Sequence, residues 1–336
     1  MENTTAPLRK VGGNDIFSSH PSLQISISTF NLVNIALVIF ISSKIDRKDI
    51  SRLYTLWLYY AQAPSDVCQI GISILQLLGL VDSSGKYYRD TVDGIQITGK
   101  VLLDFSNQVY RTLALLMVSA TFMSYRFPFT FARIFHPLKR DYLYLSGFVY
   151  VIFQVFSSNT QTVIVVRYST TILPEAFYDT WYYFNQFLGI VPSAALILLY
   201  LMSMVVIFRY TKKNLGRSDS KALHRRQLLS VIIYATTPNV LVVIYIVVNV
   251  LNVMISRIPK EDKIDTHPWI VLGGMMNKIN RYAGYVKIPV LTISTFVAFT
   301  SYRRRFLQIA FRRKTMIQVI SAANPARTSQ TWTQQI

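Results

Sequence analysis

The chain has 336 residues, of which 51% are hydrophobic and 15% are charged. Soluble domains contain about 25% charged residues, so this composition argues against a soluble enzyme. Lys and Arg number 35 against 16 Asp and Glu, a net charge of +19. A soluble protein this basic would be expected to bind nucleic acid, but most cations here stand in short segments between long apolar runs. The pattern indicates membrane topology and no nucleic-acid partner.

The N-terminal segment, residues 1–22, contains no apolar stretch of the kind found in signal peptides. We therefore expect no cleavable signal, and we expect the first long hydrophobic run to act as a signal anchor. The sequon Asn3-Thr4-Thr5 makes Asn3 a candidate for glycosylation if this segment is extracellular. The single cysteine, Cys68, cannot form a disulfide within the chain.

Seven apolar stretches predict an all-α membrane protein, a seven-transmembrane helix bundle over residues 23–299. A hydrocarbon core about 30 Å thick needs about 20 apolar residues in a helix. The first, fifth and sixth stretches are the most apolar, whereas the second, third and seventh contain ionisable residues. The predicted spans are 23–43, 53–80, 97–124, 142–166, 183–208, 228–255 and 269–299.

The connecting segments predict the orientation, because Lys and Arg accumulate on the cytoplasmic side of short loops. Four segments on one side of the bundle contain 22 basic residues, and those on the other side contain 8. The basic segments are 44–52, 125–141, 209–227 and 300–336. We therefore expect the N-terminus outside and the C-terminus inside.

Polar residues of the third span fall on one face of the helix. Lys100, Asp104, Gln108 and Arg111 follow the i, i+4, i+8, i+11 spacing, and Asn107 flanks them. In a structural interpretation, Lys100 reaches the membrane boundary and Asp104 pairs with it or with Arg111. In a functional interpretation, the stripe lines a ligand pocket in the outer half of the bundle. The sequence leaves both open.

The seventh span carries a second polar face at a similar depth. Lys278, Arg281 and Tyr285 are spaced i, i+3, i+7. A shared cavity would then pair Asp104 with Lys278 or Arg281. The cations of that cavity would exceed its acids, which favours an acidic or strongly polar small-molecule ligand. The cations counted are Lys100, Arg111, Lys278 and Arg281, and the acids are Asp66 and Asp104.

Four further residues are candidates for a conformational switch. Asp66, inside the second span, is either a buried acid satisfied by neighbouring polar groups or a polar hinge or ion site. Pro238 and Pro289 lie inside the sixth and seventh spans, where an interior proline bends a helix. Arg126 ends the third span.

Residue patterns typical of enzymes are missing from the sequence. The four histidines lie outside the spans without metal-ligand spacing, and there is no phosphate-binding glycine loop or nucleophile elbow. We expect neither enzymatic activity, nor a metal, nor a cofactor. One cofactor alternative stays open: Lys278 or Lys287 could form a retinal Schiff base with Asp104 as counterion.

The basic face has two interpretations. Its cations are either ordinary topology signals or a docking surface for an acidic intracellular partner. The tail segment 303–320 combines arginines with apolar residues, as expected of a helix lying on the anionic inner leaflet. The candidate docking residues are Arg126, Lys212, Lys213, Arg225, Arg226 and Arg303.

Seven spans, an N-terminal sequon and a basic third inner loop resemble a G-protein-coupled receptor over residues 23–314. The chain departs from the rhodopsin-like pattern. Ser124-Tyr125-Arg126 stands where that class has acid-Arg-Tyr, so only Arg126 carries over, without its acidic neighbour. Pro289 is not part of an Asn-Pro-x-x-Tyr motif, and the usual outer disulfide cannot form.

Those departures, the compact length and the junction Ser301-Tyr302-Arg303-Arg304 look like the nematode serpentine chemoreceptors. The resemblance implies a multi-pass receptor in the plasma membrane of sensory neurons or their cilia. It also implies detection of a small external chemical and activation of a heterotrimeric G protein.

A transporter or an ion channel is the alternative function. The intramembrane charges would then mark a permeation path instead of a ligand pocket. The chain shows no internal repeat of the kind that many transporters contain.

Overall fold

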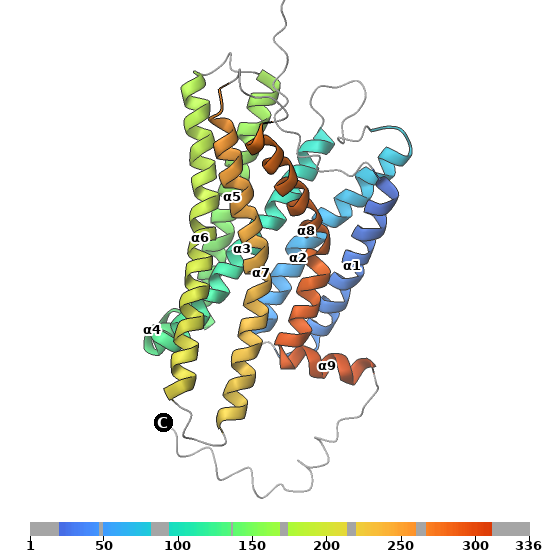
Figure 1. Ribbon diagram of the computed structural model, residues 1–336. Helices are drawn as coiled ribbons and strands as arrows, with labels where there is room; N and C mark the ends of the chain where they lie inside the picture. Colours follow the sequence, from blue (N-terminus) through green and yellow to red (C-terminus); the bar gives the residue numbers. More distant parts are fainter. Residues whose placement is uncertain are drawn as a thin grey trace, which may run out of the picture.

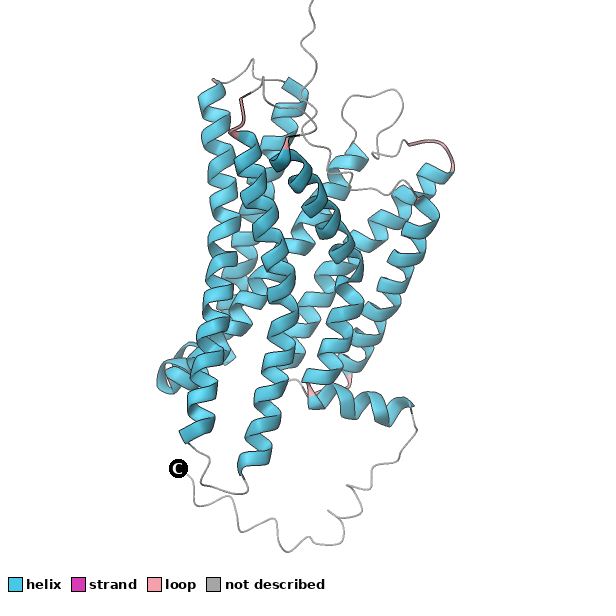
Figure 2. Cartoon of the chain, viewed as in Figure 1, coloured by secondary structure: helices cyan, strands magenta, loops and turns pink. Residues whose placement is uncertain are grey.

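The computed structural model describes residues 20–46, 50–81, 94–135, 137–168, 174–213, 220–259 and 267–310. In this part of the chain the secondary structure is helical, and Figure 2 shows no strand there. Seven of the described helices are long: α1 (Pro21–Ser43), α2 (Ile50–Leu77), α3 (Gly94–Arg126), α5 (Pro137–Tyr168), α6 (Glu175–Lys213), α7 (Ser220–Ser256) and α8 (Pro268–Ala298). Two are short: α4 (Pro128–Ile134) and α9 (Thr300–Ala310).

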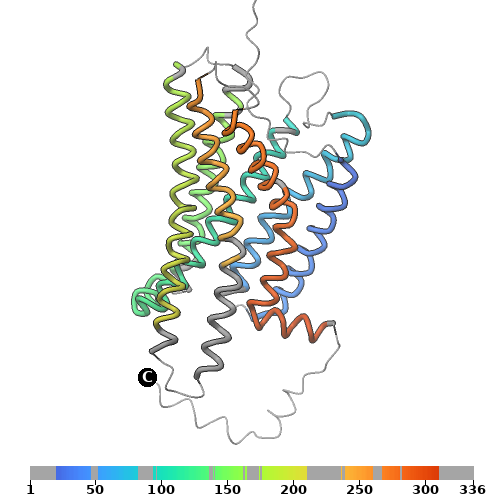
Figure 3. Tube along the Cα trace, in the orientation of Figure 1, coloured from blue at the N-terminus to red at the C-terminus, as the bar shows by residue number. Residues whose placement is uncertain are grey.

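The long helices form a closed bundle around α3. Successive long helices run in opposite directions, as the colour order in Figures 1 and 3 shows. The neighbours in the ring are α1 and α2, α2 and α3, α3 and α5, α5 and α6, α6 and α7, α7 and α8, and finally α8 and α1. Helix α3 also contacts α6 and α7, so it lies nearest the axis of the bundle.

The helix α1 shows which solvent the outside of the bundle faces. Its inner face is polar, since Gln24, Ser28 and Asn31 are 3%, 0% and 5% exposed. Its outer face consists largely of apolar side chains, and exposing these side chains to water would cost free energy. The exposed ones are Leu23, Phe30, Val33, Leu37 and Phe40.

The other peripheral helices repeat this arrangement. Their exposed apolar side chains include Ile152, Phe153 and Phe156 of α5, Leu198, Leu201 and Val205 of α6, Val243, Val247 and Val250 of α7, and Val286, Val290 and Ile293 of α8. Soluble monomers rarely expose apolar patches beyond a few hundred Å². A continuous apolar girdle around a partly polar interior is the surface of a helical membrane protein.

Hydropathy singles out three spans in the described part of the chain. The segments Pro21–Ser43, Ala176–Arg209 and Asn239–Ser256 are long and apolar enough to cross a membrane. They belong to α1, α6 and α7, so the prediction that the first, fifth and sixth spans are the most apolar is confirmed. Helix α8 together with α9 is a fourth candidate.

Several helices extend beyond the predicted spans. Helix α6 has 39 residues, an axial length of about 58 Å, whereas the prediction over 183–208 covered only its apolar part. A hydrocarbon core is about 30 Å thick, so the apolar pattern reports the length in lipid and the helix continues on both sides. The same holds for α3, α5 and α7 against the predictions 97–124, 142–166 and 228–255.

The short helix α9 lies across the end of α8, at 97° to it (Figure 1). The predicted tail helix 303–320 starts later than α9 does, and residues 311–320 lie outside the described part. Tyr302 ties α9 to the bundle: it is 0% exposed, and its hydroxyl shares a 2.7 Å hydrogen bond with Ser42 Oγ. Arg52 Nε donates to the Ser42 carbonyl oxygen at 2.8 Å, so α1, α2 and α9 meet at this point.

Tyr302→Phe should lower the stability of the purified protein by about 1 kcal/mol, because it removes one buried hydrogen bond. Tyr302→Ala should lower it by about 3–5 kcal/mol, because it also leaves a cavity. Thermal unfolding in detergent should therefore rank the wild type above Tyr302→Phe and that variant above Tyr302→Ala. Arg304→Ala, on the exposed side of α9, is the control. Equal Tm values for Tyr302→Ala and Arg304→Ala would contradict the assignment.

Candidate functional site

Helix α3 can carry polar groups because its neighbours shield it from lipid. From Val101 to Tyr125 every α3 side chain is buried or half-buried. The polar stripe predicted on the third span therefore faces other helices along its whole length. Its residues take part in three separate clusters, which we call the outer triad, the arginine cluster and the lysine cluster.

The outer triad consists of Lys100, Asp104 and Asn159, the last from α5. Lys100 Nζ donates to Asp104 Oδ2 at 2.7 Å and to Asn159 Oδ1 at 3.1 Å. Asn159 Nδ2 donates to Asp104 Oδ2 at 3.2 Å. The side chains of Lys100 and Asp104 are 24% and 35% exposed. Asp104 thus pairs with Lys100, which the structural interpretation allowed, and a second helix holds the pair.

Four further polar residues join α5 to α6 near this triad. Trp181 Nε1 donates to Ser157 Oγ at 2.9 Å, and Ser157 donates to Asn185 Oδ1 at 2.8 Å. Asn185 Nδ2 donates to Gln161 Oε1 at 2.8 Å. Sequence reasoning missed these residues, although Ser157 with Gln161 and Trp181 with Asn185 each have the i, i+4 spacing of one helix face.

The arginine cluster lies one to two turns further along α3. The Arg111 Cζ atom stands 3.1 Å from the centroid of the Tyr245 ring of α7. Arg111 Nη1 donates to Gln108 Oε1 at 2.9 Å, and Gln108 is buried. A guanidinium stacked on an aromatic face keeps its N–H groups at its edge, where they can bind planar anions.

Gly189 of α6 makes room for Tyr245. A Cβ atom at this glycine would stand 2.6 Å from the Tyr245 hydroxyl and 3.3 Å from Gln154 Nε2 of α5. Tyr150 of α5 donates from its hydroxyl to the Leu188 carbonyl oxygen at 2.5 Å. Helices α5, α6 and α7 therefore meet around the aromatic ring on which Arg111 stacks.

The lysine cluster joins α1, α2, α3 and α8. Lys287 is 7% exposed, and its Nζ donates to Asn107 Oδ1 at 2.8 Å and lies 5.8 Å from the Tyr110 ring centroid. Asp66 is 8% exposed and accepts a hydrogen bond from Asn31 Nδ2 at 3.1 Å. The Asp66 carboxylate and the Lys287 ammonium interact electrostatically. Asp66 is thus a buried acid satisfied by a neighbouring Asn.

The expected pairing of Asp104 with Lys278 is wrong for the residues that the structure describes. Asp104 pairs with Lys100, and the Lys278 side chain is exposed. Lys278 and Lys287 are nine residues apart, which at 100° per residue puts them on opposite faces of α8. Only one of them can face the bundle, and it is Lys287.

The other predicted residues lie at separate places. Arg281 belongs to α8 and Pro238 to α7, but their side chains are outside the described part, as are those of Lys212, Lys213, Arg225 and Arg226. Asn3 is also outside it. Pro289 lies inside α8. Arg126 and Arg303 are exposed, and Arg126 Cζ stands 5.5 Å from the Phe127 ring centroid.

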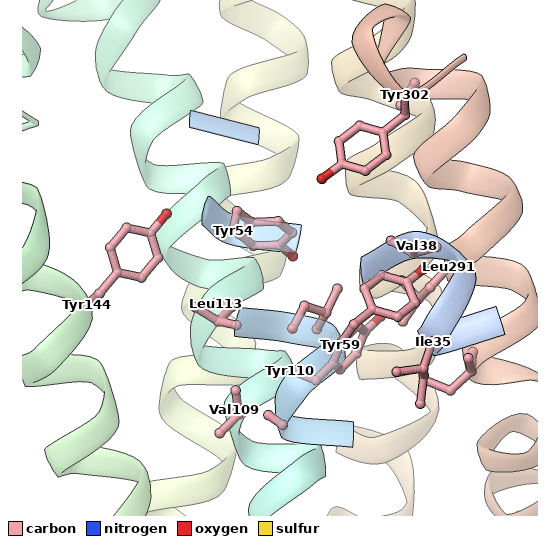
Figure 4. Packing of buried hydrophobic residues seen from close by; sticks show 14 of the residues in the cluster. Ile35, Val38, Tyr54, Tyr59, Val109, Tyr110, Leu113, Tyr144, Leu291 and Tyr302 are labelled. Atoms are coloured by element: carbon pink, nitrogen blue, oxygen red, sulfur yellow. The ribbon is translucent and has the colours of Figure 1, made fainter. Parts of the chain in front are cut away.

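Several tyrosines belong to the hydrophobic core of the bundle. Figure 4 shows Tyr54, Tyr59 and Tyr302 in the core, each at most 1% exposed. Tyr144 of Figure 4 lines, with Val109 and other apolar residues, a shallow hollow between α3 and α5. None of the predicted ligand residues lines that hollow. The polar clusters along α3 are therefore the better candidate site.

No protein-family profile matches this chain, and no curated protein is significantly similar to it.

Gly189→Ala should destabilise the bundle, because the added methyl group displaces the Tyr245 hydroxyl or separates α6 from α7. We expect a loss of about 1–3 kcal/mol, typical of overpacking. Gly284→Ala is the matched control, since a Cβ at Gly284 meets nothing within 4 Å and Ala favours a helix. The measurement is thermal unfolding in detergent, and equal Tm values for the two variants would refute the close packing around Tyr245.

Lys287→Met should lower stability by about 3–5 kcal/mol, because it leaves Asp66 as an unbalanced buried charge. Adding Asp66→Asn to Lys287→Met should recover at least 1 kcal/mol of that loss, since residues of one polar network are not additive. Lys278→Met, on the exposed face of α8, should leave the Tm unchanged. Thermal unfolding of the wild type, Lys287→Met, Asp66→Asn and the double variant measures the coupling, and strictly additive effects would show that Asp66 and Lys287 do not interact.

Proposed function

We propose that this protein is a seven-transmembrane receptor of the G-protein-coupled type that detects a small external chemical. The observation that carries the proposal is the architecture. Seven long helices of alternating direction close into a ring, with an apolar exterior and polar clusters along the central helix. Helices α2, α3, α5 and α8 do not meet a simple hydropathy criterion on their own, but Asp66 of α2 and Lys287 of α8 are buried.

The proposed orientation places the N-terminus outside the cell. With seven crossings, the end of the bundle where α1 begins is extracellular, and the end that carries α4 and α9 is cytoplasmic (Figure 1). The excess of basic residues belongs to the second end. Helix α9 would then lie along the inner leaflet, with Arg303, Arg304 and Arg305 exposed toward anionic headgroups.

The ligand would enter from the extracellular end. Lys100 of the outer triad is the seventh residue of α3 and lies about 9 Å along the helix axis from the start of α3. Arg111 lies about 26 Å from the same start. The outer triad, still partly exposed, is the first polar group that a ligand meets, and the arginine cluster is the second. Ligand binding that moved Tyr245 would act on three helices together. Tyr245 belongs to α7, its ring contacts Arg111 of α3, and its hydroxyl lies next to Gly189 of α6.

The G protein would bind at the opposite end. Arg126 ends α3 at this face and is exposed, and Arg303 opens the basic run of α9. Basic groups here suit an acidic partner surface. The resemblance to nematode chemoreceptors supports a location in the plasma membrane of a sensory neuron or its cilium.

Membranes that contain the receptor and a heterotrimeric G protein should show nucleotide exchange when a panel of small organic acids, amino acids and alcohols is applied. Arg126→Ala should lower the rate of exchange at least tenfold at equal surface expression, because it removes the central docking cation. Arg133→Ala, an exposed arginine of α4 at the same end, is the control and should retain most of the rate. Epitope tags at the two ends report expression and orientation.

A transporter or a channel would give a different result. The tested membranes would then show substrate flux or ionic current without any G protein, and Arg126→Ala would leave it unchanged. Such a flux, or staining of both tags from the same side of the membrane, would refute the receptor proposal.

A further inference from the structure

The acidic residues inside the bundle are too few to neutralise its cations. The sequence places only Asp66 and Asp104 in helix interiors, because the other helical acids stand within the first five residues of α5 and α6. Asp104 is paired with Lys100 at 2.7 Å. Arg111 forms no ion pair with a carboxylate among the described residues.

The Arg111 guanidinium has hydrogen-bonding capacity to spare. Of its five N–H donors, one donates to the neutral acceptor Gln108 Oε1. Its contact with Tyr245 covers a face of the guanidinium plane and uses none of the donors. The other four N–H donors of this half-buried cation have no acceptor in the described part of the chain.

A second cation lies close to Arg111. Lys287 Nζ is bonded to Asn107, which precedes Arg111 by one turn of α3, so the Cβ atoms of Asn107 and Arg111 are about 6 Å apart. The Lys287 and Arg111 charges repel each other, and Asp66 attracts Lys287. These three groups together carry one positive charge in excess.

We propose that Arg111, together with Gln108 and Lys287, binds a small monovalent anion, either a halide or the carboxylate of an organic acid. An uncompensated charge in the middle of a bilayer is costly, and a bound anion removes that cost. The planar fork of arginine holds a carboxylate by two hydrogen bonds and a halide by one or two. The inference rests on the membrane placement in the proposed function, but it does not require a G protein.

Arg111 and Gln108 were already candidates in the sequence, whereas Lys287 was not among the predicted ligand residues. Lys100 is neutralised by Asp104 and Lys278 is exposed, so neither supplies the excess charge. The excess arises from Arg111 and Lys287, which come from the middle of α3 and from the buried face of α8. If the anion is the carboxylate of the external ligand, the arginine cluster is its binding subsite.

The test is thermal unfolding of the purified full chain in an uncharged detergent. Sodium methanesulfonate, whose anion is neither a halide nor a carboxylate, is replaced stepwise by sodium chloride or sodium acetate at constant ionic strength. We expect a saturable rise in Tm of about 3 °C with one or both anions, since a ligand that binds only the folded state stabilises it. Saturation by chloride alone identifies a halide site, and saturation by acetate identifies a carboxylate site.

Two variants locate the effect. Arg111→Gln should abolish the saturable rise, whereas Lys278→Gln, which removes an equal charge from the exposed face of α8, should retain it. If Arg111→Gln does not fold, Arg111→Lys keeps the charge without the fork and should raise the half-saturating acetate concentration at least threefold.

Three outcomes would overturn the proposal. They are the absence of a saturable rise in the wild type, a rise that Arg111→Gln retains, and an acetate midpoint that Arg111→Lys leaves unchanged. Each leaves the receptor proposal standing, because nucleotide exchange is measured separately. Failed exchange with intact anion binding would in turn refute only the receptor proposal.

Discussion

Contact with lipid is the constraint on which the structure depends. Lipid tails solvate apolar side chains, so the outer faces of α1 and of α5 to α8 can be apolar without aggregation. Backbone polar groups in the hydrocarbon need partners within their own segment, which explains why the described chain is helical. Polar side chains must then face inward, and they hold the helices together by hydrogen bonds.

Polar side chains of the bundle lie where neighbouring helices shield them from lipid. Helix α3 carries Lys100, Asp104 and Arg111 and touches the most neighbours, and Asp66 and Lys287 lie on the buried faces of α2 and α8. Each of the three clusters along α3 joins two or more helices. Because these contacts are separate, a ligand that displaced one of them could move a subset of helices while the others held the bundle closed.

Much of the architecture was predictable from the sequence, because the length of each apolar run and the distribution of Lys and Arg between the runs depend only on the order of the residues. The most apolar spans, α1, α6 and α7, coincide with the strongest apolar runs. The stripe on the third span was predicted from spacing alone, and its residues do face other helices. Helix ends were less predictable, since a helix such as α6 continues well beyond the lipid.

The partners of the polar residues on other helices were not predictable, because they depend on the rotation of each helix about its axis. The predicted depth in the membrane placed Lys278 at the level of Asp104. The rotation of α8 about its axis, however, exposes Lys278 and buries Lys287. Asn159, which completes the outer triad, stands in a polar stretch with Ser157 and Gln161, and nothing in that stretch shows that it reaches Asp104 before α3 and α5 are packed together.

Spin labels in lipid vesicles test most directly whether lipid surrounds the apolar girdle. Labels at Val33, Val247 and Ile293, all on exposed faces, should collide more often with dissolved oxygen, which concentrates in the hydrocarbon, than with a water-soluble nickel complex. A label at Arg304 on α9 should show the opposite ratio. Higher nickel than oxygen accessibility at the three girdle positions would mean that water surrounds them, and that would contradict the account.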